Sequence, residues 1–367
     1  MADAIARIDL SHTKIKSILH DFEKSAKAVD LVYVQDNQPG IARIKKGKSF
    51  QYSVANKPLK DSASLERIKK LVIPPAWQDV WICKTENGHL QATGIDIKNR
   101  KQYKYHPLWS ALRNQTKFYR LYEFGKVLPI IRQKLKSDLS LPGLPVEKIL
   151  ATVLLLMEQT SIRVGNEAYE KLYGSFGLTT LKNRHVSIAG DQLQFAFKGK
   201  KGISHNISIK NKKLAKIVSR CKDIPGKELF QYYDVKGNHK TIDSGMVNAY
   251  IKEISGEYFT AKDFRTWAGT AHSIKAFSEL GVCDTPTENK SNIISVLDCV
   301  AKHLGNTRSV CKKYYVHPLI LNLYENNKLQ KYLAKLDSLK SKVKSSAFTA
   351  EEKLLMMILE KEGFAGK

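Results

Sequence analysis

The sequence predicts an α+β protein with a small β-rich N-terminal domain and a larger, mainly α-helical domain. Between residues 31 and 106 the chain holds short segments rich in β-branched and aromatic residues, separated by glycine, proline and asparagine. From about residue 107 onward, most segments place apolar residues at helical intervals. The 367 residues suffice for about two domains. We therefore expect domains at 1–106 and 107–367, with a linker near 107–115.

The N-terminal domain is expected to open with a helix and to continue as strands. Residues 1–30 repeat apolar side chains at helical spacing. Strands are then expected in four segments, which read LVYVQ, IARIKKGKSFQYSV, VWICKT and HLQATGIDI.

The next segment, KNRKQYKYH at 98–106, interleaves basic residues with tyrosines. On a strand, Tyr103 and Tyr105 would share one face and Lys104 would lie on the other. Cations neutralise phosphates, and Gln102 can reach base edges in a groove. Two interpretations stay open from the residues alone. The segment is a DNA-contacting strand, or it is a solvated edge strand whose tyrosines pack inward.

The C-terminal domain carries local helix signals. A helix is expected after Pro145, in VEKILATVLLLMEQT, because proline suits the first turn of a helix. Thr260 and Asp263 have the spacing of a capping box, and Gly281 follows the last periodic residue of that segment. Residues 349–352 repeat the capping pattern before a final helix.

Two further segments complete the domain. KLQKYLAKLDSLKSKVK, at 328–344, places leucines and Val343 on one face with lysines around the rest, which predicts one more helix. Between 185 and 210 a strand island with a turn at Gly190 and Asp191 predicts a small β-hairpin insert.

The charge of the chain points to a polyanionic partner. Lysine and arginine number 61 and aspartate and glutamate 35, so the net charge is 61 − 35 = +26. Such an excess favours nucleic acid first and an anionic membrane surface second. A basic protein that is merely soluble is the alternative.

Several classes of protein are disfavoured. No apolar run approaches the roughly 20 residues that span a bilayer, and the first residues lack the apolar core of a signal peptide. The motif GxxxxGK[ST] does not occur, which disfavours an ATP-driven machine. The five cysteines are far apart and form no CxxC pair, so neither a zinc site nor a disulfide framework is expected. They are Cys83, Cys221, Cys283, Cys299 and Cys311. We expect a reducing intracellular compartment.

Two adjacent tyrosines, Tyr314 and Tyr315, stand in the basic segment SVCKKYYVHPLI. A phenol with a pKa of roughly 10 is ionised in only about one molecule in a thousand at pH 7. Attack on a phosphodiester therefore needs cations at the phosphate oxygens, an acid for the leaving oxygen and help for the phenolate. Arginine suits the first role and lysine the second. Neighbouring helical residues point about 100° apart, so only one of the tyrosines can face a given phosphate.

Residues for these roles follow one another along the chain. The ordered set is Arg163, Lys200, Arg265, Asn306 and Tyr315. Singly, each has an ordinary explanation: an arginine is usually a solvated charge, a tyrosine usually packs, and a lysine between Lys198 and Lys201 can simply belong to a basic hairpin. Only the ordered set is specific.

This ordered set resembles that of the type IB DNA topoisomerases, in particular their poxvirus-like and bacterial branch. The resemblance covers nearly the whole chain. In the N-terminal part it rests on PGIARIKKGKSFQY, RIKKLVIPPAWQDVWIC and GHLQATGIDIKNRKQYKYH, which look like the DNA-clamping domain of that family. It implies a catalytic domain of the type IB topoisomerase and tyrosine recombinase kind.

The resemblance also implies a role for each site residue. Tyr315 attacks a DNA phosphodiester to give a 3′-phosphotyrosyl bond and a free 5′-hydroxyl. Arg163 and Arg265 hold the non-bridging oxygens, and Lys200 protonates the leaving 5′-oxygen. Asn306 stands where relatives often have histidine. An amide can donate a hydrogen bond but is no acid at pH 7, so a proton role at this position is in doubt.

DNA contacts are expected from two groups of basic and polar residues. They are Arg100, Lys101, Gln102, Tyr103, Lys104 and Tyr105 in the N-terminal domain, and Lys198, Lys201, His205, Lys312 and Lys313 in the catalytic domain. Because the reaction exchanges one phosphodiester for another, neither ATP nor a divalent metal is expected to be required. The expected partner is duplex DNA, not a membrane, bound by a monomer that closes as a clamp. The expected compartment is the cytoplasm, at the nucleoid if the host is bacterial.

Two alternatives to this family stay open. Tyrosine recombinases share the Arg–Lys–Arg–Tyr chemistry but usually carry His-x-x-Arg at the second arginine, where this chain has Lys262 in KDFR. A catalytically silent DNA- or RNA-binding protein would explain the charge alone, but it would need no particular tyrosine and no ordered set.

Overall fold

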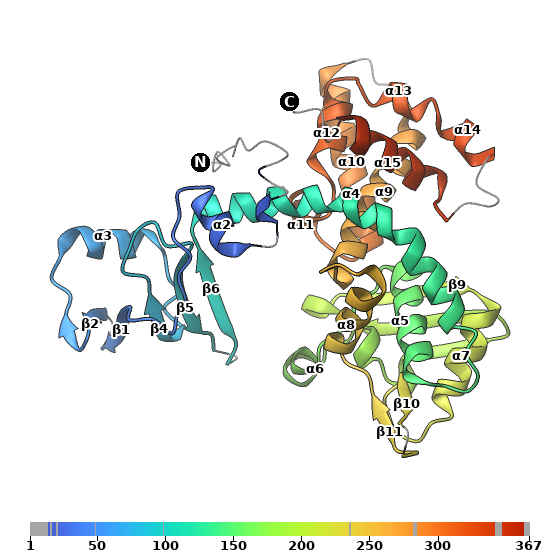
Figure 1. Cartoon of the computed structure of the whole chain (residues 1–367), viewed down its shortest axis with the longest axis horizontal. Coiled ribbons are helices and arrows are strands. Elements are labelled where there is room, and N and C mark those ends of the chain that lie inside the picture. The colour runs from blue at the N-terminus through green and yellow to red at the C-terminus, as the bar shows by residue number, and fades with distance from the viewer. Residues whose placement is uncertain are drawn as a thin grey trace. The chain divides into compact units, whose positions relative to one another are not determined.

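A computed structural model of the chain describes residues 14, 17–19, 21–47, 49–97, 99–234, 236–281, 285–341 and 347–362 (Figure 1). It separates into two compact units, one up to Tyr119 and one from Arg120 onward. The division falls inside the long helix α4 (Pro107–Asp138). The prediction of a linker at 107–115 is therefore wrong, because these residues form the first turns of α4.

The first unit is built on a six-stranded antiparallel sheet with strand order β3-β2-β1-β4-β5-β6. Its strands are β1 (Ile41–Lys46), β2 (Ser49–Val54), β3 (Lys57–Pro58), β4 (Gln78–Ile82), β5 (Leu90–Ile95) and β6 (Lys101–Tyr105). Helix α3 (Ser62–Lys70) buries Ile68 against the sheet residues Ile41 and Ile82. The prediction of strands is confirmed for three of the four segments, whereas 31–35 contributes only an isolated bridge at Val32.

A second small core joins helix α2 (Phe22–Lys27) to the start of α4. Ala26 and Val29 pack there with Trp109 and Leu112. Of the helix expected at 1–30, only this part and a few isolated residues lie within the described ranges.

Strand β6 lies at the edge of the described sheet and presents its tyrosines outward. The rings of Tyr103 and Tyr105 stack with centroids 6.0 Å apart, and the residues are 49% and 43% exposed. The interpretation in which these tyrosines pack inward is therefore wrong.

The second unit is mainly helical. Its helices are α5 (Val146–Thr160), α6 (Glu167–Tyr173), α7 (Lys212–Lys222), α8 (Ser244–Ser255), α9 (Ala261–Leu280), α10 (Pro286–Leu304), α11 (Arg308–Tyr314), α12 (Pro318–Glu325), α13 (Gln330–Leu333), α14 (Leu336–Ser341) and α15 (Ala350–Glu362). Helix α5 is the centre of its core, with residues such as Ile149, Val153 and Leu156 completely buried.

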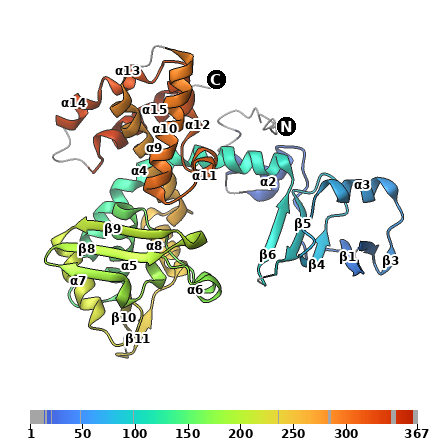
Figure 2. The same ribbon diagram turned by 180° about the vertical axis from the view of Figure 1, so that it is seen from behind.

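Two small sheets interrupt these helices. Strands β7 (Val186–Ala189), β8 (Gln192–Lys198) and β9 (Ser204–Lys210) form an antiparallel three-stranded sheet that packs against α5 and α7 (Figure 2). Strand β8 buries every second residue, including Phe195 and Phe197, and so joins the main core. Strands β10 (Gln231–Tyr233) and β11 (His239–Thr241) form a separate pair that the sequence did not suggest.

The capping predictions are confirmed. The side chain of Asp263 accepts hydrogen bonds from the backbone and hydroxyl of Thr260 at the start of α9, and Gly281 caps its end. At α15, Glu352 accepts from the backbone of Thr349 and its own N–H donates to the threonine hydroxyl.

The prediction of a single lysine-rich helix at 328–344 is wrong. The chain forms the short helices α13 and α14, and Lys335 N–H donates to the carbonyl of Tyr332 in the turn between them. Tyr332 and Leu336 are both buried, so the break lets two short apolar faces reach the core. Val343 lies outside the described residues.

Candidate active site

Arg163 lies in a tight loop after α5. The helix ends at Ser161, whose φ of 55° turns the chain sharply. Gly165 (φ +104°) then packs against the backbone of Gly177, at a distance that leaves no room for a Cβ atom at Gly177. The carbonyl of Arg163 accepts a hydrogen bond from Leu178 N–H at 2.9 Å. The loop that carries Arg163 is therefore held in place by the backbone at Gly177 and Leu178.

Arg265 lies in the second turn of α9 and is 5% exposed. Its guanidinium donates to the carbonyl of Ser161 and, at 2.7 Å, to that of Leu304. The side chain thus ties the end of α5 to the end of α10. Its Nε is buried and has no hydrogen-bond partner among the described residues.

Asn306 is oriented by Arg163. Arg163 Nη2 donates to Asn306 Oδ1 at 2.5 Å and to the carbonyl of Gly305 at 3.1 Å. A guanidinium only donates, so the amide oxygen of Asn306 must face Arg163 and its NH₂ group must point elsewhere. That Nδ2 atom is buried without a hydrogen-bond partner in the described part of the chain. Asn306 therefore offers N–H groups to an acceptor that the described residues do not supply.

Tyr315 follows the last residue of α11 and is fixed through its backbone. Its N–H donates to Cys311 O at 2.9 Å, and its carbonyl accepts from the hydroxyl of Thr270 at 3.1 Å. A Cβ atom at Gly269 would stand 2.8 Å from that carbonyl, so only glycine allows α9 this close. The guanidinium carbon of Arg265 lies 5.3 Å from the centre of the Tyr315 ring.

Tyr314 differs from its neighbour. It is the last residue of α11, and the ammonium of Lys313 lies 5.5 Å from its ring centre. Tyr315, not Tyr314, is thus the tyrosine whose ring lies against a buried arginine.

Lys200 lies on a hairpin turn. Strands β8 and β9 pair up to Lys198 and Ser204, and Lys200–Gly202 form a 3₁₀ turn between them in which Lys200 is exposed. Gly199 packs against the imidazole of His205, and so does Gly305 beside Asn306. The structure therefore brings four predicted residues together as two contacting pairs, Arg163 with Asn306 and Arg265 with Tyr315. The turn that carries the fifth, Lys200, lies next to Asn306 through His205.

The site carries uncompensated positive charge. Burial and the nearby charge of Arg265 lower the pKa of Arg163 to about 10, and burial lowers the pKa of Arg265. Burial, then the two arginines, also lowers the pKa of His205. Neither arginine forms an ion pair with a carboxylate among the described residues. Such an arrangement suits an anionic ligand.

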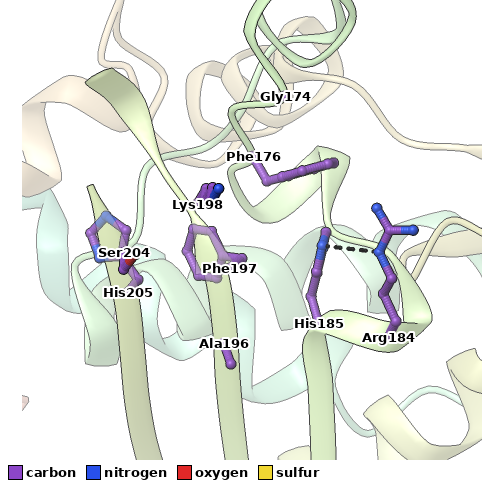
Figure 3. A pocket seen from close by; sticks show the side chains of 9 residues that line it. All are labelled: Gly174, Phe176, Arg184, His185, Ala196, Phe197, Lys198, Ser204 and His205. Atoms are coloured by element: carbon purple, nitrogen blue, oxygen red, sulfur yellow. Dashed lines mark hydrogen bonds between the residues drawn. The ribbon is translucent and has the colours of Figure 1, made fainter. Parts of the chain in front are cut away.

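A pocket of about 440 Å³ adjoins the hairpin (Figure 3). Phe176 and Phe197 form apolar walls, while Lys198, Arg184 and His205 line its rim. Among the described residues no group of three or more His, Cys, Asp or Glu side chains is placed to hold a metal ion.

Residues of the N-terminal unit that are expected to contact DNA bind carboxylates and a backbone carbonyl of the same unit. Arg100 and Gln102 both donate to Asp96 Oδ2, at 2.8 and 3.0 Å, and Lys101 pairs with Asp36 at 2.6 Å. Lys104 donates to the carbonyl of Val72 at 3.3 Å. In the second unit, Lys198, Lys201, Lys312 and Lys313 are exposed.

Sequence reasoning missed the backbone groups that shape the site. The carbonyls of Ser161 and Leu304 hold Arg265, and Gly269 with Thr270 holds Tyr315. One signal was present: a glycine inside a helical segment, as in TWAGT, often marks a close approach of another backbone.

The fold places a tyrosine beside a buried arginine, with a second, partly buried arginine near them, and this arrangement suits a ligand that is an anionic ester. Residues 100–345 match the family described as "Eukaryotic DNA topoisomerase I, catalytic core", and residues 49–96 match "Bacterial DNA topoisomerase IB, N-terminal domain". The DNA topoisomerase 1B of Acanthamoeba polyphaga mimivirus is 34% identical over 78% of this chain and 88% of its own length. The DNA topoisomerase 1B of vaccinia virus and the DNA topoisomerase I of monkeypox virus are each 25% identical over 77% of this chain and 89% of their own.

The chain belongs to the type IB DNA topoisomerases. The resemblance, the fold class and the enzymatic activity predicted from the sequence are thereby confirmed. Among the helices in the described ranges, none has both the length and the apolar run needed to cross a membrane.

Proposed function

We propose that Tyr315 is the nucleophile with which this topoisomerase cleaves one strand of duplex DNA. One observation carries the proposal: the Tyr315 ring lies against Arg265, and neither Arg265 nor Arg163 has a carboxylate partner among the described residues. A phosphodiester placed there would supply the missing negative charge. Attack on phosphorus forms the 3′-phosphotyrosyl bond and breaks the bond to the 5′-oxygen, and the phenolic proton is lost to solvent.

Arg163, Arg265 and Asn306 stabilise the charge that develops on the phosphate oxygens. The unpartnered Nδ2 of Asn306 supports this role, because it is a buried donor that lacks only an acceptor. Asn306 transfers no proton, so the acid is another residue. We propose that Lys200 protonates the leaving 5′-oxygen, and its position on a turn packed through His205 toward Asn306 is consistent with that role.

The reaction requires neither ATP nor a metal ion in this proposal. The phosphotyrosyl ester replaces one diester by another, and the 5′-hydroxyl reverses the exchange. While the strand is open, torsional strain lets the downstream duplex rotate, which relaxes supercoils of either sign.

We further propose that residues 1–106 form a clamp with the catalytic domain, 107–367, around duplex DNA, and that a monomer suffices. The exposed stacked tyrosines of β6 and its polar neighbours are the proposed contacts of the clamp, while Lys198, Lys201, Lys312 and Lys313 are proposed to contact phosphates. His205 is half-buried. The place of action would be the cytoplasm, at the nucleoid in a bacterial host.

The test is relaxation of a negatively supercoiled plasmid in EDTA without ATP. Wild type and the matched control Tyr314→Phe should relax the plasmid, whereas Tyr315→Phe should bind DNA and leave it supercoiled. Relaxation by Tyr315→Phe would refute the nucleophile, and recombination between plasmids would favour the recombinase alternative.

A further inference from the structure

We infer that His205 is a positioning residue whose imidazole sets the distance between the turn that carries Lys200 and the loop that carries Asn306. The inference rests on the proposed function of Lys200 as the acid. It assigns no proton transfer to His205 itself.

The imidazole rests on a fixed surface. His205 and Phe197 are direct partners in the pairing of β9 with β8, and their rings stack with centroids 5.0 Å apart and an interplanar angle of 17°. Phe197 is 7% exposed and belongs to the main core. Figure 3 shows the two rings on neighbouring strands at the edge of the pocket.

Two glycines contact the same edge of this ring. A Cβ atom at Gly199 would lie 2.5 Å from His205 Nε2, and one at Gly305 would lie 2.6 Å from His205 Cε1. Gly199 directly precedes Lys200, and Gly305 directly precedes Asn306. The ring therefore lies against both backbone segments, the one that carries the proposed acid and the one that carries the amide.

Hydrogen bonds hold both segments in place. Gly199 N–H donates to Ile203 O at 2.7 Å and Gly202 N–H to Gly199 O at 3.0 Å, so the turn moves as one piece. On the other side, Gly305 O accepts from Arg163. A change in the ring would consequently shift the whole Lys200 turn relative to the arginines.

Such a shift matters because the Lys200 ammonium must come within hydrogen-bond reach of the leaving 5′-oxygen. A misplacement of about 1 Å can lower a rate about 100-fold. Loss of the imidazole should therefore impair the acid step selectively, and leave phosphate binding by the arginines largely intact.

The test uses a leaving group that needs no acid. The cleavage position is first mapped on a DNA fragment by trapping the covalent complex. Single-turnover cleavage is then compared on two duplexes with either oxygen or sulfur at the bridging 5′ position. A thiolate leaves without protonation, so a defect confined to proton delivery disappears on the sulfur duplex.

His205→Ala should cleave the oxygen duplex about 100-fold more slowly than wild type and the sulfur duplex at close to the wild-type rate. Lys200→Ala should show the same pattern, whereas Arg163→Ala should be slow on both duplexes. Asn206→Ala is the matched control, because its exposed side chain points to the other face of the same strand. It should match wild type on both.

A second variant decides the matter if His205→Ala fails to fold. Gly199→Ala keeps the imidazole, and the φ of −93° at this position suits alanine, but the new Cβ must push the ring and the turn apart. It should reproduce the selective defect. An equal loss on both duplexes, or no loss, would overturn the inference. Wild type that cleaves neither duplex would refute the proposed function instead.

Discussion

Asn306 shows how one contact fixes the chemistry of a side chain. Because its oxygen accepts from Arg163, its NH₂ group is left as a donor without a partner among the described residues. The sequence suggested that an amide at this position cannot act as an acid. It could not show which way the amide points, since that depends on Arg163, 143 positions earlier in the chain.

This orientation leads to a prediction about pH. Wild-type cleavage should show no step at the usual histidine pKa near 6.5, because Asn306 does not titrate and burial, then the two arginines, lower the pKa of His205. Asn306→His should introduce a pH dependence that wild type lacks. Single-turnover cleavage between pH 5.5 and 8 is the measurement, and a wild-type step at the usual histidine pKa would contradict the assignment.

Helix α9 is the element that assembles the site. It carries Arg265 in its second turn, and Gly269 and Thr270 one turn later hold the backbone of Tyr315. The helix itself could be predicted, because capping at Thr260 and termination at Gly281 are local signals. The contact of this helix with the end of α11 could not be predicted. Nothing in either segment indicates that the Tyr315 carbonyl lies 2.8 Å from where a Cβ atom of Gly269 would be.

Gly269→Ala is expected to displace Tyr315 while leaving DNA binding intact. The added Cβ must push the Tyr315 carbonyl away, and a shift of about 1 Å in this proposed nucleophile should slow cleavage about 100-fold. Covalent complex formation and DNA affinity are the paired measurements. Ser278→Ala, on an exposed turn of the same helix, should behave as wild type. Undiminished cleavage by Gly269→Ala would refute this account of the helix contact.

The predicted bounds of helices were wrong where packing against residues outside the segment determines the structure. Residues 107–115 continue into α4 because Trp109 and Leu112 pack in the first unit's core, so no linker forms. The lysine-rich segment breaks into α13 and α14, because Tyr332 and Leu336 both reach the main core. Periodicity identified the apolar residues correctly but not the breaks between helices.

At the scale of the whole molecule, the net charge of +26 leads to a prediction about salt. Each neutralised phosphate releases counterions, so contact with about six phosphates should weaken DNA binding roughly a thousandfold between 50 and 200 mM salt. Lys313→Gln should reduce the slope of log affinity against log salt by about one. Affinity measured across this salt range gives both values. An affinity that stays flat would contradict a clamp built on phosphate contacts.

Arg163 and Arg265, which have no carboxylate partner in the described part of the chain, also bear on protein design. Burial lowers the pKa of both, and the charge of Arg265 lowers the pKa of Arg163 further, so the fold disfavours the charged form of each side chain. A search for thermostabilising substitutions would accordingly select apolar residues at these positions. Such variants would lose the proposed catalyst, and loss of Arg265 would also leave the carbonyls of Ser161 and Leu304 without their donor. Substitutions that raise thermal stability should therefore be sought at other positions. DNA itself should stabilise the folded enzyme, since its phosphates supply negative charge next to the two arginines.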